Sequence, residues 1–117
     1  MSTEEQLQEL EDNMQQAKHF IEVKNSCVKL FKNREFKKVI LDYYFKEEAA
    51  RLVMAKASSL NKEQQAVIDN MIYGIGALSN FFDSVLTRGT QAEQAYKEDE
   101  DARTQILQED LSNGWSK

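Results

Sequence analysis

The chain has few side chains that could carry out catalysis or hold a metal ion. It contains one histidine, His19, and one cysteine, Cys27. A metal site needs several clustered ligands, and a helical di-iron site needs paired glutamate-x-x-histidine motifs, which the sequence lacks. His19 adjoins Phe20, and Cys27 falls on the apolar side of the first predicted helix. We therefore expect a histidine at the edge of a packed face and an inert buried thiol, with no metal, no cofactor and no enzymatic activity.

A glycine-containing segment superficially resembles a dinucleotide-binding loop: Gly74-Ile75-Gly76-Ala77-Leu78-Ser79. Such a loop requires a strand before it and a helix after it. Here the glycines fall inside an amphipathic helical pattern with no strand nearby, so we reject nucleotide binding. We expect Gly74 and Gly76 to allow a neighbouring helix to cross closely.

The composition favours a small all-α protein. The 117 residues include no proline and only four glycines, whereas a sheet protein of this length needs many tight turns built from those residues. Hydrophobic residues make up 41% of the chain, enough for the core of one domain. No apolar stretch approaches the roughly 20 residues that span a bilayer, and the acidic N-terminal sequence lacks a signal-peptide pattern. With its single cysteine, the chain is expected to be intracellular when made and away from membranes.

The first predicted helix carries a heptad pattern. Ser2 with Glu5, or Thr3 with Gln6, forms a capping-box pattern at its start. Residues then recur at alternating intervals of three and four, the spacing of a seam that faces one partner helix: Leu7, Leu10, Met14, Ala17, Ile21, Lys24, Val28 and Phe31. Lys24 is the charged member of this seam. We expect one helix of about 28 residues, roughly 40 Å long.

The second predicted helix begins after Asn33, a suitable N-cap. At α-helical spacing one of its faces is apolar: Phe36, Val39, Ile40, Tyr43 and Tyr44. Leu41 and Phe45 fall off that face, so we expect this segment to be apolar nearly all round and well buried. A turn or kink between Tyr43 and Phe45 is the alternative to a continuous helix that ends near Ala57.

The third predicted helix begins after Asn61, which forms a capping-box pattern with Gln64, and it runs to about Arg88. It carries two adjoining apolar stripes. The first stripe contains Val67, Met71, Gly74, Leu78, Phe81 and Val85, and the second stripe contains Ile68, Ile72, Ile75, Phe82 and Leu86. Together they form a broad face that suits packing against more than one helix.

Gly89 leaves two alternatives for the C-terminal segment. Either the helix ends there and Thr90 with Glu93 caps a fourth helix, or it continues through the glycine at a cost of about 1 kcal/mol. We predict a single domain, a helical hairpin or bundle of about four helices with long terminal arms. Its core is at residues 18–88, its N-terminal helical arm at 1–17, and its acidic C-terminal helix and tail at 89–117. The arms have too little apolar surface to be stable alone, so they need each other or a partner.

Charge is segregated along the chain, whose net charge is −5. Residues 18–38 contain seven basic and two acidic side chains, and residues 93–110 contain seven acidic and two basic ones. The simplest interpretation is a set of solvated helix faces. The alternative is that acidic ends meet the basic middle, within one chain or between copies. Nucleic-acid binding is disfavoured because the chain is acidic and its basic stretch lacks interleaved aromatic residues on one exposed face.

The segment from Asn33 to Val53, NREFKKVILDYYFKEEAARLV, resembles a signature of small all-helical proteins of tailed bacteriophages, which are encoded among virion-morphogenesis genes. Its distinctive pieces are residues 36–38 and 44–48, and the resemblance extends through Ile75–Leu78 and the acidic segment after Gly89. Such proteins commonly carry a glycine where this chain has Tyr43, so we expect a tighter or more helical turn there. The resemblance implies a role in or around the virus particle.

These observations lead to one functional hypothesis and two alternatives. We expect a non-enzymatic phage structural or assembly protein that acts through helix-mediated contacts with copies of itself or with other virion proteins, as an oligomer or part of a larger assembly. It would be made in the host cytoplasm and assembled into the virion. The alternatives are an assembly chaperone or scaffold absent from the mature particle, and a small acidic inhibitor of a host enzyme. The candidate partner-binding residues lie in the arms: Leu7, Leu10, Met14, Tyr96, Ile106, Leu107 and Trp115.

Overall fold

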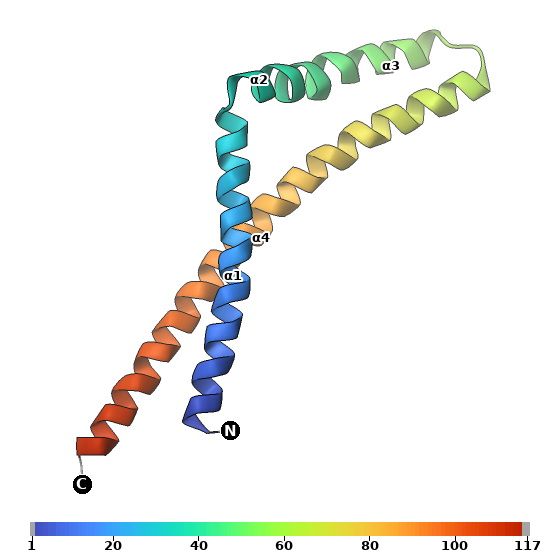
Figure 1. The fold of residues 1–117 in the computed structure, drawn as a ribbon. Helices are drawn as coiled ribbons and strands as arrows, with labels where there is room; N and C mark the ends of the chain where they lie inside the picture. Colours follow the sequence, from blue (N-terminus) through green and yellow to red (C-terminus); the bar gives the residue numbers. More distant parts are fainter. Residues whose placement is uncertain (1, 116–117) are drawn as a thin grey trace. The chain divides into compact units, whose positions relative to one another are not determined.

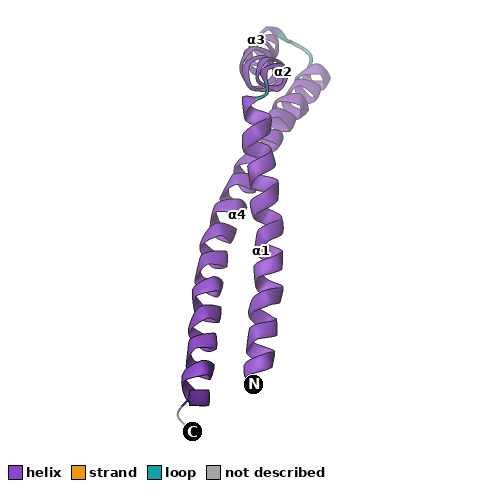
Figure 2. Cartoon of the chain, turned by 60° about the vertical axis from the view of Figure 1, so that its left-hand side comes forward, coloured by secondary structure: helices purple, strands orange, loops and turns teal. Residues whose placement is uncertain are grey.

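A computed structural model describes the backbone of residues 2–115 and the side chains of residues 2–113, and within this range the protein is all-α. Helix α1 spans Thr3–Lys32, a second run consists of α2 (Arg34–Phe36), the π-helix η1 (Lys37–Glu48) and α3 (Ala49–Ser58), and α4 spans Lys62–Trp115. Figure 2 shows short loops before α2 and between α3 and α4. The described range therefore contains three continuous helical runs, and the expected count of about four is not confirmed, because α4 passes through Gly89 without a break.

Polar side chains cap the helices where their spacing predicts. Ser2 Oγ accepts a hydrogen bond from the backbone N–H of Glu5 at 3.1 Å, so the first of the two capping patterns is the one used. Asn33 Oδ1 accepts from the backbone N–H of Phe36 at 2.9 Å. Asn61 Oδ1 accepts two such bonds at the start of α4, the shorter at 2.8 Å. These bonds satisfy amides that have no partner within the first turn, and they fix where each helix begins.

The chain forms two compact units. Unit 1 contains the residues up to Asn25 and those from Leu86 onward, so it consists of the N-terminal part of α1 and the C-terminal part of α4. These two segments run side by side in opposite directions (Figure 1) and are joined by ion pairs. The end helices therefore pair with each other within one chain. Unit 2 contains Ser26–Val85, which comprise the end of α1, the run from α2 to α3 and the first part of α4.

The core of unit 2 is built around Phe82 of α4. Its ring lies edge-to-face against three others, with centroid distances of 5.3 Å to Phe31, 5.7 Å to Phe36 and 6.3 Å to Phe45. This geometry places the positive edge of one ring on the negative face of another, and it adds to the stability gained from burying the rings. Leu52 on α3 and Ile75 on α4 are buried. Aromatic side chains thus join α1, α2, η1 and α4.

The π-helical geometry of η1 determines which side chains of the second run are packed. Hydrogen bonds from i to i+5 widen the turn beyond the α-helical value of about 3.6 residues. Half-buried residues accordingly recur at intervals of four or five: Phe36, Ile40, Leu41, Tyr44, Phe45, Glu48 and Ala49. Val39 and Tyr43 are 56% and 50% exposed, whereas Leu41 and Phe45 are half-buried. The predicted packed face is therefore right for Phe36, Ile40 and Tyr44 and wrong for Val39 and Tyr43, because it assumed α-helical spacing. The predicted burial nearly all round is wrong. No break separates Tyr43 from Phe45.

A polar cluster sits where η1 gives way to α3. Arg51 Nε donates a hydrogen bond to Glu48 Oε2 at 3.1 Å, and the second guanidinium nitrogen pairs with the other carboxylate oxygen. This hydrogen bonding lowers the pKa of the Glu48 carboxyl, and the Tyr43 side chain, five residues earlier, adds to the effect. Tyr43 reaches Glu48 because side chains five apart stack in a π-helix. The Arg51 guanidinium thus forms its ion pair with Glu48, three residues earlier in the chain.

Neither Gly74 nor Gly76 lies at a close helix crossing in unit 2. A Cβ atom at Gly74 would have one atom within 4 Å, the Oη of Tyr44 at 3.9 Å, and a Cβ at Gly76 would have none. The predicted crossing at these glycines is therefore wrong for the helices of this unit. Gly74 instead leaves a gap in the exposed surface of α4.

Candidate partner-binding surfaces

The residues considered for chemistry are not part of a reactive cluster. His19 is exposed, and its ring lies edge-on to Phe20 with centroids 5.5 Å apart. Cys27 is buried, and burial raises the pKa of its thiol, which disfavours the reactive thiolate. Among the described residues, no three His, Cys, Asp or Glu side chains are grouped so that they could hold a metal ion. The candidate functional features of the described residues are therefore their packed and exposed helix surfaces.

Unit 1 is an antiparallel two-helix coiled coil. The predicted heptad residues of this part of α1, Leu7, Leu10, Met14, Ala17, Ile21 and Lys24, are all buried or half-buried, and Glu11 beside them is half-buried as well. Opposite them, α4 has packed residues at the same alternating intervals: Gly89, Ala92, Tyr96, Asp99, Arg103 and Ile106. Gly89 and Ala92, at one end of the seam, leave little bulk between the two helices there.

Lys24 lies against Gly89 in this seam. A Cβ atom at Gly89 would lie 2.6 Å from Cδ and 2.7 Å from Cγ of Lys24, and nearer still to its Cβ. The Lys24 ammonium forms an ion pair with Glu93, one turn further along α4. Lys24 can therefore occupy a seam position because the residue opposite it, Gly89, has no side chain. A single charged residue in a seam of this kind helps to fix its register.

Three half-buried charged residues of the coiled coil, Glu11, Asp99 and Arg103, were missed by sequence reasoning, which looked for apolar side chains alone. Arg103 Nη1 donates a hydrogen bond to Glu11 Oε2 at 3.0 Å, and Asp99 is half-buried on the same face of α4 as Arg103. The three-four spacing from Ala92 was the signal that could have found Asp99 and Arg103. Lys24–Glu93 joins the basic middle to the acidic C-terminal segment within one chain, which is one of the forms of charge complementarity that the sequence left open. Glu11–Arg103 instead joins the two acidic ends.

The predicted partner-binding residues of the arms differ in how accessible they are. Met14 is 2% exposed, because it packs inside the coiled coil, and it offers no surface to a partner in this conformation. Leu7, Leu10, Tyr96 and Ile106 are half-buried. Leu107 is exposed, and the side chain of Trp115 lies outside those that the structure describes. Most of these residues therefore pack between the two arms, and Leu107 is the exposed one among those whose side chains the structure describes.

A groove of about 590 Å³ nevertheless runs along one side of the coiled coil. It is lined by the apolar Leu10, Ala102 and Ile106 and by polar and acidic side chains, including Glu9 and Glu109. The groove is bordered by side chains from both arms, so pairing of α1 with α4 creates it. It is a secondary candidate for partner contact.

An apolar surface with three exposed large side chains lies in unit 2, on the first stripe of α4. The two stripes of this helix have different surroundings. In the second stripe Ile75 is buried and Phe82 forms the aromatic core. In the first stripe Val67, Met71 and Phe81 are 58%, 50% and 58% exposed. Leu78 and Val85 of the first stripe are half-buried, so the second stripe packs against the rest of unit 2 and the first stripe is covered only in part.

The surroundings of the first stripe are almost free of charge. Between residues 64 and 87, α4 has two charged side chains, Asp69 and Asp83, although charged residues make up 30% of the chain. Asp69 forms an ion pair at 2.7 Å with Lys56 of α3, beside the packed second stripe. Depletion of charge together with exposed methionine and aromatic residues is characteristic of the core of a protein–protein interface.

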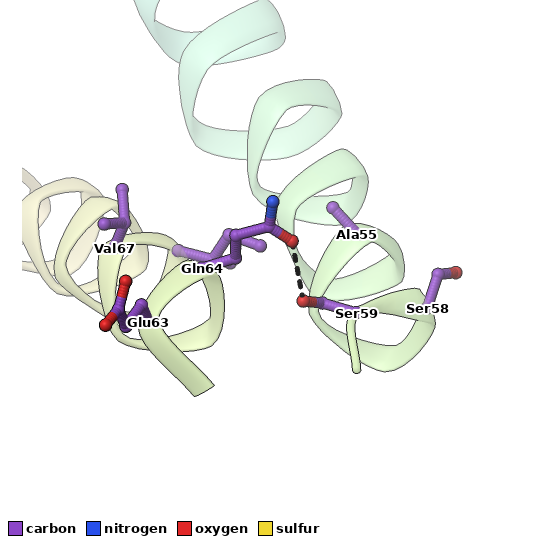
Figure 3. A pocket seen from close by; sticks show the side chains of 7 residues that line it. Ala55, Ser58, Ser59, Glu63, Gln64 and Val67 are labelled. Carbon is purple, nitrogen blue, oxygen red and sulfur yellow. Dashed lines mark hydrogen bonds between the residues drawn. The ribbon is translucent and has the colours of Figure 1, made fainter. Parts of the chain in front are cut away.

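A groove of about 600 Å³ lies between α3 and α4 at one end of the first stripe (Figure 3). Ala55 and Ser59 line it from the α3 side, and Gln64 and Val67 from α4. The Ser59 hydroxyl donates a hydrogen bond to Gln64 Oε1 at 3.3 Å across the connection. Because Val67 belongs to both features, the groove extends the uncovered surface toward α3.

Comparison with known proteins finds no significant similarity to any protein family, curated protein or solved structure. Within the described range, no helix combines the length and apolar character needed to cross a membrane.

Proposed function

We propose that this chain is a non-enzymatic structural or assembly protein of a tailed bacteriophage, which acts through helix-mediated contacts with copies of itself or with other virion proteins. It would be made in the host cytoplasm and would work as part of a larger assembly in or around the virion. The proposal joins the resemblance of Asn33–Val53 to phage proteins with the surface of α4 in unit 2.

The observation that carries the proposal is the uncovered first stripe. A solvated helix face normally carries charged side chains, but this one presents Val67, Met71 and Phe81 to water. Leaving such a surface exposed is unfavourable by roughly 25 cal/mol for each Å² of apolar area that burial would remove from water. A partner helix with a matching apolar seam would recover that free energy. A catalytic role would not require an apolar helix face to be exposed.

The proposal also accounts for the bundle expected from the sequence. The two stripes of α4 together suit more than one neighbouring helix, yet the chain leaves Val67, Met71 and Phe81 of the first stripe exposed. On this proposal, the bundle of about four helices is completed when a partner supplies helices that cover the first stripe.

Quantitative mass spectrometry of purified mature phage particles tests this function. We expect the chain at a stoichiometric copy number that matches a symmetry-related position in the particle. Its absence from mature particles, with presence in assembly intermediates, would instead identify an assembly chaperone or scaffold. Absence from both, with growth inhibition when the chain is expressed alone in the host, would identify an inhibitor of a host protein.

A further inference from the structure

The first stripe has a spacing that repeats itself when the helix is reversed. Its positions, from Val67 to Val85, are separated by four, three, four, three and four residues. An antiparallel copy of the same helix therefore presents the same alternation of positions. We propose that a second copy of this chain covers the first stripe, with the two α4 helices packed antiparallel about a two-fold axis that passes between Gly74 and Leu78, at the level of residue 76. This inference rests on the proposed function and names its first partner.

The side chains of the stripe are complementary in this arrangement. The two-fold axis places Leu78 of one copy opposite Gly74 of the other, Met71 opposite Phe81, and Val67 opposite Val85. The gap at Gly74, where a Cβ would meet Tyr44 Oη alone at 3.9 Å, gives the branched Leu78 side chain a space to enter. The Met71 sulfur would lie against the Phe81 ring, a favourable contact for a thioether. The gap and the side chain that fills it thus come from the same stripe.

Electrostatics favours this surface for self-association. The chain carries a net charge of −5, so two copies repel each other over much of their surfaces. The stripe and the outward-facing residues beside it, Asn70, Ala77 and Ser84, carry no charge. Two copies can meet there without desolvating a charged side chain or placing like charges opposite each other.

The proposed seam is as long as one that already holds this protein together. Val67 to Val85 spans 18 residues, about 27 Å along the helix axis. In unit 1 the seam from Leu7 to Lys24 is of similar length and contains the same number of packed positions on each helix. That seam includes Lys24, Asp99 and Arg103, whereas the first stripe is entirely apolar. The stripe therefore matches the length of a seam that the fold already uses, and it contains no charged residue.

The test combines sedimentation velocity with site-specific disulfide formation on the full chain. Over a concentration series, the wild type should sediment with twice the monomer mass. Met71→Lys should shift it to the monomer mass with an unchanged far-UV circular dichroism spectrum, because Met71 is half exposed. Tyr73→Lys, an equally drastic change at an exposed position off the stripe, should leave the dimer intact.

Disulfide formation tests the direction of packing. In a Cys27→Ala background, oxidation of the double variant Met71→Cys/Phe81→Cys should give a covalent dimer, and so should a mixture of the two single variants. Neither single variant should cross-link to itself, because the two copies of position 71 would lie about 15 Å apart along the axis, too far for a disulfide. Self-cross-linking of Met71→Cys alone would overturn the antiparallel arrangement.

Sedimentation at the monomer mass throughout the series would overturn the dimer. If such a monomeric chain were still found in mature particles, the proposed function would stand and the stripe would be covered by a different protein. If the chain were a dimer but absent from particles, self-association would stand and the proposed virion role would be overturned. The two proposals can therefore fail independently.

Discussion

Replacing Gly89 by alanine tests the closest contact between α1 and α4 in unit 1. The new Cβ would lie 2.6 Å from Cδ of Lys24 and closer to Cβ, an atom that cannot move without the α1 backbone. Overpacking of this kind costs typically about 1–3 kcal/mol. Alanine also gains about 1 kcal/mol over glycine inside a helix. The net result for Gly89→Ala should therefore be a loss of up to about 2 kcal/mol in the free energy of unfolding.

Gly76→Ala is the matched control, because it makes the same change in the same helix where nothing lies within 4 Å of the new atom. It should raise the free energy of unfolding only by the difference in helix propensity between alanine and glycine, about 1 kcal/mol. Urea unfolding followed by far-UV circular dichroism gives both values. In addition, Lys24→Gly should relieve the clash in Gly89→Ala, so the double variant should be more stable than the sum of the single effects. Equal stabilisation by Gly76→Ala and Gly89→Ala would falsify the close crossing.

Three further predictions concern the cores of the two units and the buried thiol. In unit 2, Phe82→Ala should lower the free energy of unfolding by roughly 3 kcal/mol because it removes the centre of the aromatic cluster, whereas the exposed Tyr73→Ala should change it by less than about 0.5 kcal/mol. In unit 1, Met14→Ala should cost about 2–3 kcal/mol in the same urea titration, and the exposed Leu111→Ala should be nearly neutral; a neutral Met14→Ala would contradict its burial in the seam. Burial raises the pKa of the Cys27 thiol in the folded protein above its ordinary value. As the pH rises, the thiol therefore loses its proton in the unfolded chain before it does so in the folded protein. The contribution of the buried thiol to stability is present below the ordinary thiol pKa and is lost as the pH rises above it. The unfolding midpoint should therefore fall more steeply at alkaline pH for the wild type than for Cys27→Ala, and iodoacetamide should modify the native thiol slowly.

The helices and their starting points could be predicted from the sequence because local signals specify them. Asn33 and Asn61 cap helices by bonding to amides two or three residues away, so their effect can be seen in a short stretch of sequence. The α1 heptad likewise identified the face that packs, since every seam residue from Leu7 to Phe31 is buried or half-buried. Scarcity of glycine and proline indicated the all-α class.

Other features depend on contacts between distant segments and could not be predicted from spacing. The packed face of residues 36–49 is set by the π-helical turn, whereas α-helical spacing favours Val39 and Tyr43. Which glycine lies at a close crossing depends on the opposing helix, and Gly89 is 65 positions away in sequence from Lys24, the residue it contacts. The two stripes of α4 look equivalent in sequence, and the structure alone shows which one the chain covers.

The measurement that tests the central claim most directly is the copy number of stripe variants in phage particles. A phage lacking the gene is complemented with the wild type, with Met71→Lys/Phe81→Lys, or with Tyr73→Lys, and purified particles are analysed by quantitative mass spectrometry. We predict that the wild type and Tyr73→Lys are present at the same copy number, and that the stripe variant accumulates as folded protein but is missing from particles. Incorporation of the folded stripe variant at the wild-type copy number would contradict the claim that the first stripe of α4 carries the function.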